Sequence, residues 1–167
     1  MTFTKCAIIL INMRNHLITR SMKLPFNIEK VFQFFCDVKN LQKITPPELN
    51  FKILSPLPIE IAKGTIIDYQ MSLFRIPFRW RSKICLWNPP YEFMDTQVEK
   101  GPYKIWEHTH RFYKENGKTT IEDSVSYRLP LWPIGEIAYP IVRSQLNRIF
   151  DYRLKTIKEI FLKESNS

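Results

Sequence analysis

The alternation of apolar and polar residues is most regular in the second half of the chain. Two runs with a period of two, at 103–113 and 119–129, flank the dipeptide Asn116-Gly117. An Asn-Gly pair between alternating runs is the strongest local signal for a β-hairpin with a two-residue turn. If these two residues form the centre of the turn, Glu115 faces Lys118 and the register of the whole hairpin follows.

Strand patterns recur earlier in the chain and are separated by segments rich in proline and glycine. We predict five further strands, at 16–24, 50–55, 65–73, 78–87 and 91–99. The separators have the composition of turns, and their regular spacing is typical of a sequential antiparallel meander.

Two short helices are predicted between the first and second strands. Asn27 is a suitable N-cap for a helix that carries Ile28, Val31, Phe32 and Phe35 on one side. Asp37 can cap a second helix over 38–44, which Pro46-Pro47 ends.

The pattern changes to a period of 3.6 near the C-terminus and predicts a helix of about 28 residues. Its apolar positions are Ile134, Ile137, Ala138, Ile141, Val142, Leu146, Ile149, Phe150, Leu154, Ile157, Ile160 and Phe161. Pro140 should kink this helix or mark its start. A long one-sided helix needs a broad apolar partner, which only the concave face of the meander offers.

The length of 167 residues indicates a single domain. Residues 1–15 depart from the strand pattern and are taken as an N-terminal extension, followed by a domain over 16–163 and a tail over 164–167. The apolar run 6–11 is too short for a membrane span. Three widely spaced cysteines indicate reduced thiols, so we expect a cytoplasmic protein.

The formal net charge of +9 raises the question of an acidic partner. The densest basic cluster is Arg75, Arg79, Arg81 and Lys83, which alternates with apolar residues and so forms one outward strand face. A solvated face is the favoured interpretation. A weak contact with anionic membranes through Arg75, Arg79 and Arg81 stays open as an alternative, and we do not expect a nucleic acid.

The hairpin register places polar residues on the inward, mostly apolar face. His110 lies opposite Asp123, and His108 lies opposite Val125. A buried polar cluster costs stability unless it is paired, so this one either braces the core or meets a ligand.

The register extends one strand further back. There Asp95 lies opposite His108, and Gln97 lies opposite Trp106. Each imidazole then has a carboxylate available, His108 with Asp95 and His110 with Asp123. Such pairing fixes the tautomer of a histidine.

The order of elements, with a long final helix gripped by a curved antiparallel sheet, resembles the helix-grip fold of the SRPBCC or START-like superfamily. The likeness is closest to small bacterial ligand-binding members. It rests on 24–32, Ile44-Thr-Pro-Pro47, 64–69, Ile76-Pro-Phe-Arg-Trp80, 93–97, Gly101-Pro-Tyr103, Trp106-Glu-His-Thr-His110 and 123–127. The resemblance implies an α+β fold with a ligand cavity between helix and sheet. Its members include polyketide cyclases and dehydratases and lipid-transfer proteins.

We therefore expect the chain to bind a small hydrophobic or amphipathic molecule that is lipid-, quinone- or polyketide-like. The expected ligand-binding residues are Tyr69, Trp80, Asp95, Gln97, Trp106, His108, His110, Phe112, Asp123 and Tyr127. One alternative is a cyclase or dehydratase that uses acid–base chemistry, with His108, His110 and Asp123 as catalytic candidates. Another is a basic membrane or nucleic-acid adaptor that has no cavity.

A metal site is a further interpretation of the two histidines. His108-Thr-His110 is followed by Glu115, but Glu115 belongs to the turn and faces the opposite side of the strand. Two histidines with Asp95 or Asp123 could hold a divalent ion. We nevertheless predict no metal site and no cofactor.

Overall fold

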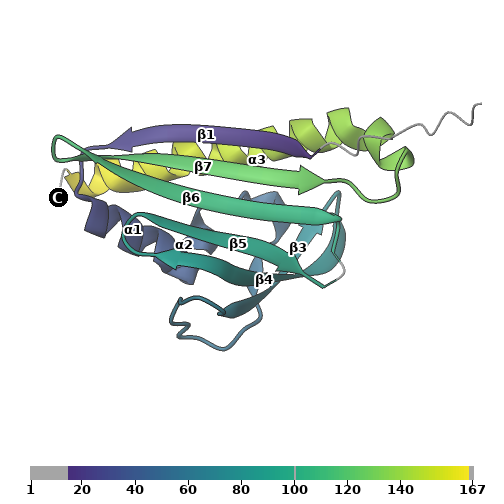
Figure 1. The fold of residues 1–167 in the computed structure, drawn as a ribbon, viewed down its shortest axis with the longest axis horizontal. Coiled ribbons are helices and arrows are strands. Elements are labelled where there is room, and N and C mark those ends of the chain that lie inside the picture. The colour runs from purple at the N-terminus through teal and green to yellow at the C-terminus, as the bar shows by residue number, and fades with distance from the viewer. Residues whose placement is uncertain (1–14, 100, 166–167) are drawn as a thin grey trace, which may run out of the picture.

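The computed structural model describes residues 15–99 and 101–165 of the chain. The predicted extension therefore lies almost wholly outside the described residues. The elements are β1 (His16–Leu24), α1 (Ile28–Cys36), α2 (Val38–Lys43), the 3-10 helix η1 (Pro47–Leu49), β2 (Lys52–Ile53), β3 (Ile66–Leu73), β4 (Ile76–Asn88), β5 (Glu92–Val98), β6 (Ile105–Glu115), β7 (Lys118–Arg128) and α3 (Ile134–Ser165). This is the predicted α+β helix-grip fold (Figure 1).

The strands form one antiparallel sheet of seven strands in the order β1-β7-β6-β5-β4-β3-β2. The predicted meander is confirmed, and β1 joins it beside β7. The second predicted strand is wrong in length, because only Lys52–Ile53 pair with β3. A two-residue edge strand presents few unpaired backbone groups to other chains.

The predicted hairpin register is also confirmed. Glu115 pairs with Lys118, and His110 pairs with Asp123. Asn116 and Gly117 both have positive φ angles, of 48° and 73°. This is the backbone that a type I′ turn requires, and asparagine and glycine adopt it at the lowest cost.

Each of the two short helices begins directly after the residue that was predicted to cap it. The side chain of Asn27 accepts a hydrogen bond from the backbone N–H of Lys30, and that of Asp37 accepts one from Lys39, each at 2.9 Å. Helix α1 buries Ile28, Val31 and Phe32. These residues pack against the ends of the strands near the β6–β7 turn and against the last turns of α3.

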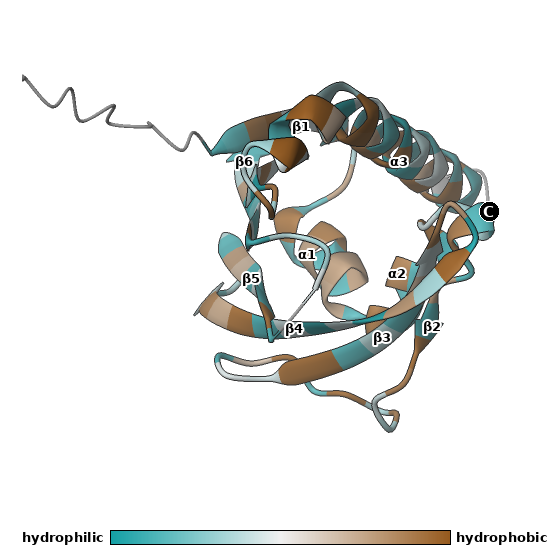
Figure 2. Cartoon of the chain, turned by 90° about the vertical axis from the view of Figure 1, so that its right-hand side faces the viewer, coloured by the Kyte–Doolittle hydropathy of each residue, from teal (hydrophilic) through white to brown (hydrophobic). Residues whose placement is uncertain are grey.

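Helix α3 lies along β1 and covers the open side of the curved sheet (Figure 2). It begins at Ile134 and includes Pro140, so the proline does not mark its start. Its buried side chains Leu146, Phe150, Ile157 and Phe161 pack against the sheet. The predicted grip of sheet on helix is therefore present.

The first two turns of α3 differ from the prediction. Ile134, Ile137 and Ile141 are 67%, 79% and 61% exposed, although they belong to the predicted apolar stripe. In this segment Tyr139 and Val142 pack against the hydrophobic core instead. Tyr139 stacks on His16 with ring centroids 4.1 Å apart, which turns the isoleucines away from the sheet.

The basic face of β4 is partly neutralised by neighbouring acids. Arg81 donates to both carboxylate oxygens of Asp68, at 2.6 and 3.0 Å, and also pairs with Glu99. Its guanidinium lowers the pKa of Asp68 below the ordinary value of 3.8. Arg75 and Arg79 are exposed. The basic surface available to a partner is therefore smaller than the sequence suggests.

Candidate functional site

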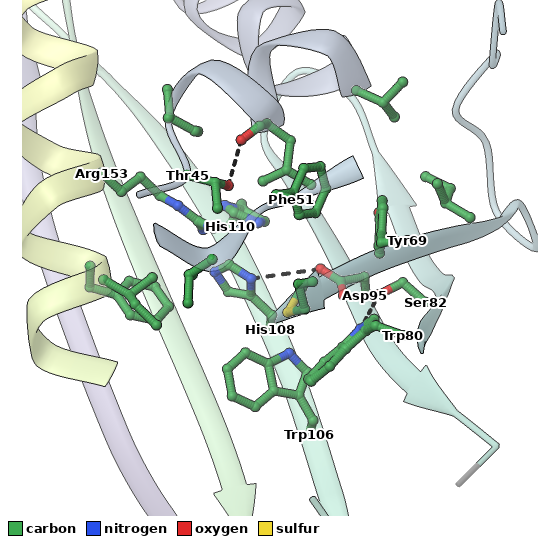
Figure 3. Close-up of a pocket in the computed structure, with 18 of the residues that line it drawn as sticks. Thr45, Phe51, Tyr69, Trp80, Ser82, Asp95, Trp106, His108, His110 and Arg153 are labelled. Carbon is green, nitrogen blue, oxygen red and sulfur yellow. Dashed lines mark hydrogen bonds and ion pairs between the residues drawn. The ribbon is translucent and has the colours of Figure 1, made fainter. Parts of the chain in front are cut away.

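A cavity of about 170 Å³ lies between the concave face of the sheet and the three α-helices (Figure 3). Its wall is largely apolar and aromatic. Trp80 and Trp106 meet edge to face at one side, with ring centroids 5.1 Å apart. Other apolar and aromatic lining side chains are Tyr69, Phe51, Phe93, Leu146, Ile149 and Phe150. An apolar cavity of about 150 Å³ is large enough to hold benzene.

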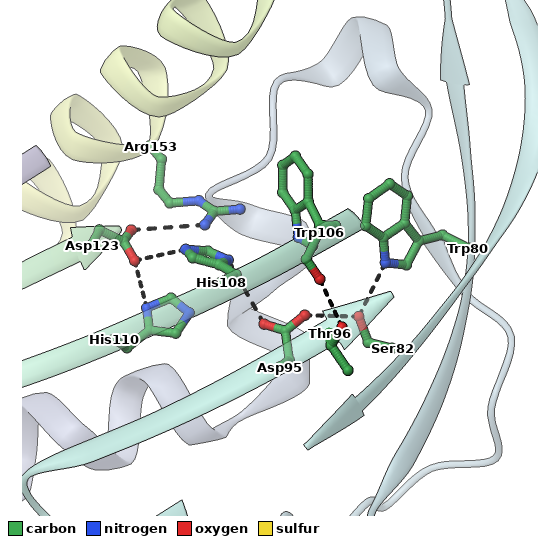
Figure 4. A network of polar contacts seen from close by, with 9 residues as sticks. All are labelled: Trp80, Ser82, Asp95, Thr96, Trp106, His108, His110, Asp123 and Arg153. Carbon is green, nitrogen blue, oxygen red and sulfur yellow. Dashed lines mark hydrogen bonds and ion pairs between the residues drawn. The ribbon is translucent and has the colours of Figure 1, made fainter. Parts of the chain in front are cut away.

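Three of the polar lining residues lie on the neighbouring strands β5 and β6. Asp95, His108 and His110 face the cavity, and Asp123 of β7 lies behind the two imidazoles (Figure 4). The strand pleat explains this gathering, since residues two apart on a strand share a face and the ladder places Asp95 opposite His108.

Asp123 is the centre of the cluster. One oxygen, Oδ1, lies 2.8 Å from Nε2 of His108, as a hydrogen bond, and 2.6 Å from Nδ1 of His110. The His110 ring is turned so that this second contact falls outside hydrogen-bond geometry, and Nδ1 has no hydrogen-bond partner among the described residues. Asp95 is further away, with Oδ1 3.7 Å from Nδ1 of His108. The sequence had paired one acid with each histidine, whereas Asp123 contacts both.

The electrostatics of the cluster follow from its burial. Burial alone would raise the pKa of Asp123, but the two imidazoles beside it lower that pKa well below 3.8. Burial lowers the pKa of His110 below 6.5, against the opposing effect of Asp123. Asp123 is therefore an anion and His110 a neutral imidazole at neutral pH.

A short chain of hydrogen bonds holds Asp95 in place. Its Oδ2 accepts from the hydroxyl of Ser82 at 2.9 Å, and Ser82 accepts from the indole N–H of Trp80 at 3.0 Å. The other oxygen of Asp95 is left facing His108. The carboxylate is oriented by groups outside the histidine pair.

The structure adds Arg153 of α3, which sequence analysis missed. Its guanidinium lines the cavity, with Nη1 3.8 Å from Oδ2 of Asp123 and Cζ 5.2 Å from the centre of the Phe150 ring. Its Nε is buried without a hydrogen-bond partner among the described residues. The helical pattern could have identified Arg153, because it falls three residues after Phe150 and four before Ile157 on the buried stripe.

The ten predicted ligand-binding residues divide into two groups. The residues that line the cavity are Tyr69, Trp80, Asp95, Trp106, His108 and His110, and those that do not are Gln97, Phe112, Asp123 and Tyr127.

Each residue of the second group has another position. Gln97 donates to the carbonyl of Tyr103 at 2.9 Å and lies so close to Gly101 that a Cβ there would be 2.4 Å from its amide. Phe112 packs in the phenylalanine core beside α1. Tyr127 is fully buried, and burial raises its pKa to about 12.

One combination of cavity residues has the composition of a metal site. Asp95, His108 and His110 each offer a ligand atom, and the three atoms lie within 4.8 Å of one another. The same residues could instead move a proton, since a neutral imidazole held by a carboxylate can act as a general base. The geometry is compatible with either chemistry.

No helix among the described residues is both long and apolar enough to cross a membrane. A search of curated proteins found no match to this chain.

Solved structures share its fold at low sequence identity. The Zhui aromatase/cyclase from Streptomyces sp. R1128 superposes with a TM-score of 0.71 at 13% identity, covering 91% of this chain and 96% of that one. Protein Ms6760 from Mycobacterium smegmatis gives 0.66 at 13% identity, covering 89% and 92%. Protein TTHA0849 from Thermus thermophilus gives 0.64 at 17% identity, covering 90% and 99%.

A family profile gives the identification that these structural likenesses alone do not. The profile described as polyketide cyclase/dehydrase and lipid transport matches residues 24–150, from the end of β1 into α3. With its seven-stranded sheet closed over a long C-terminal helix, the chain belongs to the polyketide cyclase/dehydrase and lipid transport family.

Proposed function

We propose that this protein binds a small amphipathic molecule with a flat or short apolar body and an oxygen-bearing polar group. The observation that carries the proposal is the cavity itself, which is apolar along most of its wall and polar at one end. Ligand sites typically have this composition, because the wall supplies affinity and a few polar groups fix orientation.

The polar end indicates which ligand groups fit. The guanidinium of Arg153 presents donors, and His110 and Asp95 present acceptors. A hydroxyl, carbonyl or carboxylate oxygen would find a partner here. The volume of about 170 Å³ suits a body of one or two rings, or a short chain, without large rearrangement.

A direct test uses naphthol as the probe and naphthalene as its counterpart without a hydroxyl. Trp80 and Trp106 line the cavity, so occupancy should quench tryptophan fluorescence. We expect naphthol to bind at least tenfold more tightly than naphthalene, which corresponds to about 1.4 kcal/mol for the polar end.

Two tryptophan substitutions on the same helix provide the matched control. Ile149 lines the cavity and is partly exposed, so Ile149→Trp should fill the cavity and weaken naphthol binding at least tenfold. Ile141 is 61% exposed, and Ile141→Trp should leave binding unchanged. Equal binding by both variants, or none by the parent protein, would contradict the proposal.

A cyclase or dehydratase activity is the second candidate, and a specific observation favours it. His110 is a neutral imidazole at the cavity wall, and Asp123 lies behind it. A carboxylate beside an imidazole stabilises the imidazolium that forms when the ring accepts a proton. Catalysis would be favoured over binding alone by a substrate that the parent protein converts and the His110→Gln variant does not. The variant should still bind naphthol with the affinity of the parent protein.

The third hypothesis was an adaptor without a cavity. A closed, dry interior would favour it, and the cavity of about 170 Å³ supports the two cavity hypotheses instead.

A further inference from the structure

We propose that Asp95, His108 and His110 hold one divalent transition-metal ion at the polar end of the cavity. Their ligand atoms lie within 4.8 Å of one another. The two imidazoles are side by side on β6, with ring centroids 4.0 Å apart. Two histidines and one carboxylate are a common ligand set for zinc and for non-haem iron.

The contacts of Asp123 determine which ring nitrogens are available. Asp123 takes Nε2 of His108 and Nδ1 of His110, so Nδ1 of His108 and Nε2 of His110 are the atoms left for an ion (Figure 4). A ligating histidine usually gives its other nitrogen to a carboxylate, which orients the ring and raises its basicity. Asp123 accepts a hydrogen bond from Nε2 of His108 and lies 2.6 Å from Nδ1 of His110, so it stands beside the second nitrogen of both rings.

The distance between Asp95 and His108 fits shared coordination better than a direct bond. Oδ1 of Asp95 lies 3.7 Å from Nδ1 of His108, which is too long for a hydrogen bond. Two ligands of one tetrahedral ion with bonds of 2.0–2.1 Å are about 3.3 Å apart. A closure of a few tenths of an ångström would therefore bring this pair to ligand spacing.

The second carboxylate oxygen is already occupied. Ser82 donates to Oδ2 of Asp95 at 2.9 Å, so Oδ1 is the oxygen left for a metal ion. Ser82 is itself buried and fixed by Trp80. Asp95 and His108 thus each have a hydrogen bond with a residue outside the ligand set, and His110 has a 2.6 Å contact with Asp123.

The charge balance also favours a cation. Asp95 and Asp123 bring two negative charges, and the nearby guanidinium of Arg153 brings one positive charge. Histidines that bind a metal are neutral. With both rings neutral, the cluster carries a net charge of about −1 in a largely apolar environment, which attracts a cation.

Three protein ligands leave one or more coordination positions open towards the cavity. An ion there would meet an oxygen of a bound molecule directly. The proposal does not depend on the organic ligand, since the ion is expected to bind in its absence.

The test uses chelator-treated protein dialysed against Zn²⁺, followed by metal analysis and thermal unfolding. We expect one ion per chain and a rise in Tm with Zn²⁺. In Asp95→Asn the amide can still accept from Ser82, so the fold should persist while zinc affinity falls at least tenfold.

The matched control is His16→Gln. His16 also pairs with a carboxylate, Glu136, at 3.1 Å, but lies at the start of β1 outside the cavity lining. It should bind zinc as the parent protein does. Zinc binding that is absent from the parent protein, unchanged in Asp95→Asn, or lost in His16→Gln would overturn the metal proposal. None of these results would affect naphthol binding by the metal-free protein, so the two proposals fail separately.

Discussion

A single acid on the inward face of β7 organises the polar end of the cavity. Asp123 is 3% exposed and stands between apolar neighbours, Ile121 and Val125, on its own strand face. Such a carboxylate is stable only when paired, and both imidazoles of β6 lie within 2.8 Å of one of its oxygens. The pairing holds the rings whose other edges face the cavity, so the stability of the fold and the proposed ligand binding depend on the same residue.

The pKa values of this cluster predict how stability changes with pH in chelator-treated protein. The unfolded chain protonates His110 near pH 6.5, whereas folded His110 stays neutral to lower pH. Unfolding therefore takes up a proton below pH 6.5, and the free energy of unfolding falls as pH falls. For one proton the slope is at most about 1.4 kcal/mol per pH unit. Asp123 adds a further loss below its unfolded pKa of about 3.8.

Urea unfolding between pH 7.5 and pH 4.5 would measure this effect, with His110→Gln as the comparison. Glutamine has an N–H group that can donate to Asp123, but it does not titrate. The variant should show a shallower dependence below pH 6.5 than the parent protein. A parent protein that becomes more stable on acidification, or a variant with the same slope, would contradict the assignment of a neutral buried His110.

Helix α3 has an exposed first part and a longer part that packs against the sheet. From Leu146 onward its buried side chains fall at spacings of three and four residues, with Arg153 as the polar member of that stripe. The first two turns expose Ile134, Ile137 and Ile141 instead. The same helix thus closes the cavity, supplies its guanidinium, and extends past the packed region.

Two alanine substitutions on α3 test how firmly the sheet grips it. Ile157 is 0% exposed within the phenylalanine-rich core, so Ile157→Ala should lower the free energy of unfolding by about 2–5 kcal/mol. Ile141 is 61% exposed, and Ile141→Ala should change stability by less than about 0.5 kcal/mol. Chemical denaturation of both variants gives the comparison. A small effect at Ile157 would mean that α3 is loosely held.

The molecule as a whole places its cavity and its basic surface apart. The cavity lies inside the curved sheet. Arg75 and Arg79 are exposed and do not line it, and the Arg81 side chain pairs with Asp68 and Glu99. A face that is partly neutralised and not continuous with the cavity is typical of a solvated surface.

The expected consequence is that reversing the exposed charges leaves the cavity unaffected. Arg75→Glu combined with Arg79→Glu should change naphthol affinity less than twofold, because physiological salt screens the interactions of exposed charges. The parent protein should also stay in the supernatant when anionic phosphatidylserine vesicles are pelleted at that salt concentration. Pelleting that the double variant abolishes would instead assign a membrane contact to this face.

Local sequence signals account for most of the fold. The Asn116-Gly117 turn needs no tertiary contact to select its hairpin, because the two residues adopt positive φ at low cost, and the ladder then places His110 opposite Asp123. The caps at Asn27 and Asp37 are equally local. These features could be read directly because each depends on residues a few positions apart.

Tertiary structure decided what lies around the cluster. Strand register placed Asp95, His108 and His110 on one face, but only packing turned both imidazoles towards Asp123 and left Asp95 3.7 Å from His108. The curvature of the sheet likewise separated Trp80 and Trp106, which line the cavity, from Phe112 and Tyr127, which do not. Arg153 reaches the site because α3 crosses the open side of the sheet, a contact between segments 30 residues apart. A pattern with a period of two or 3.6 identifies the face of an element, whereas the depth of a side chain behind that face depends on how the elements pack.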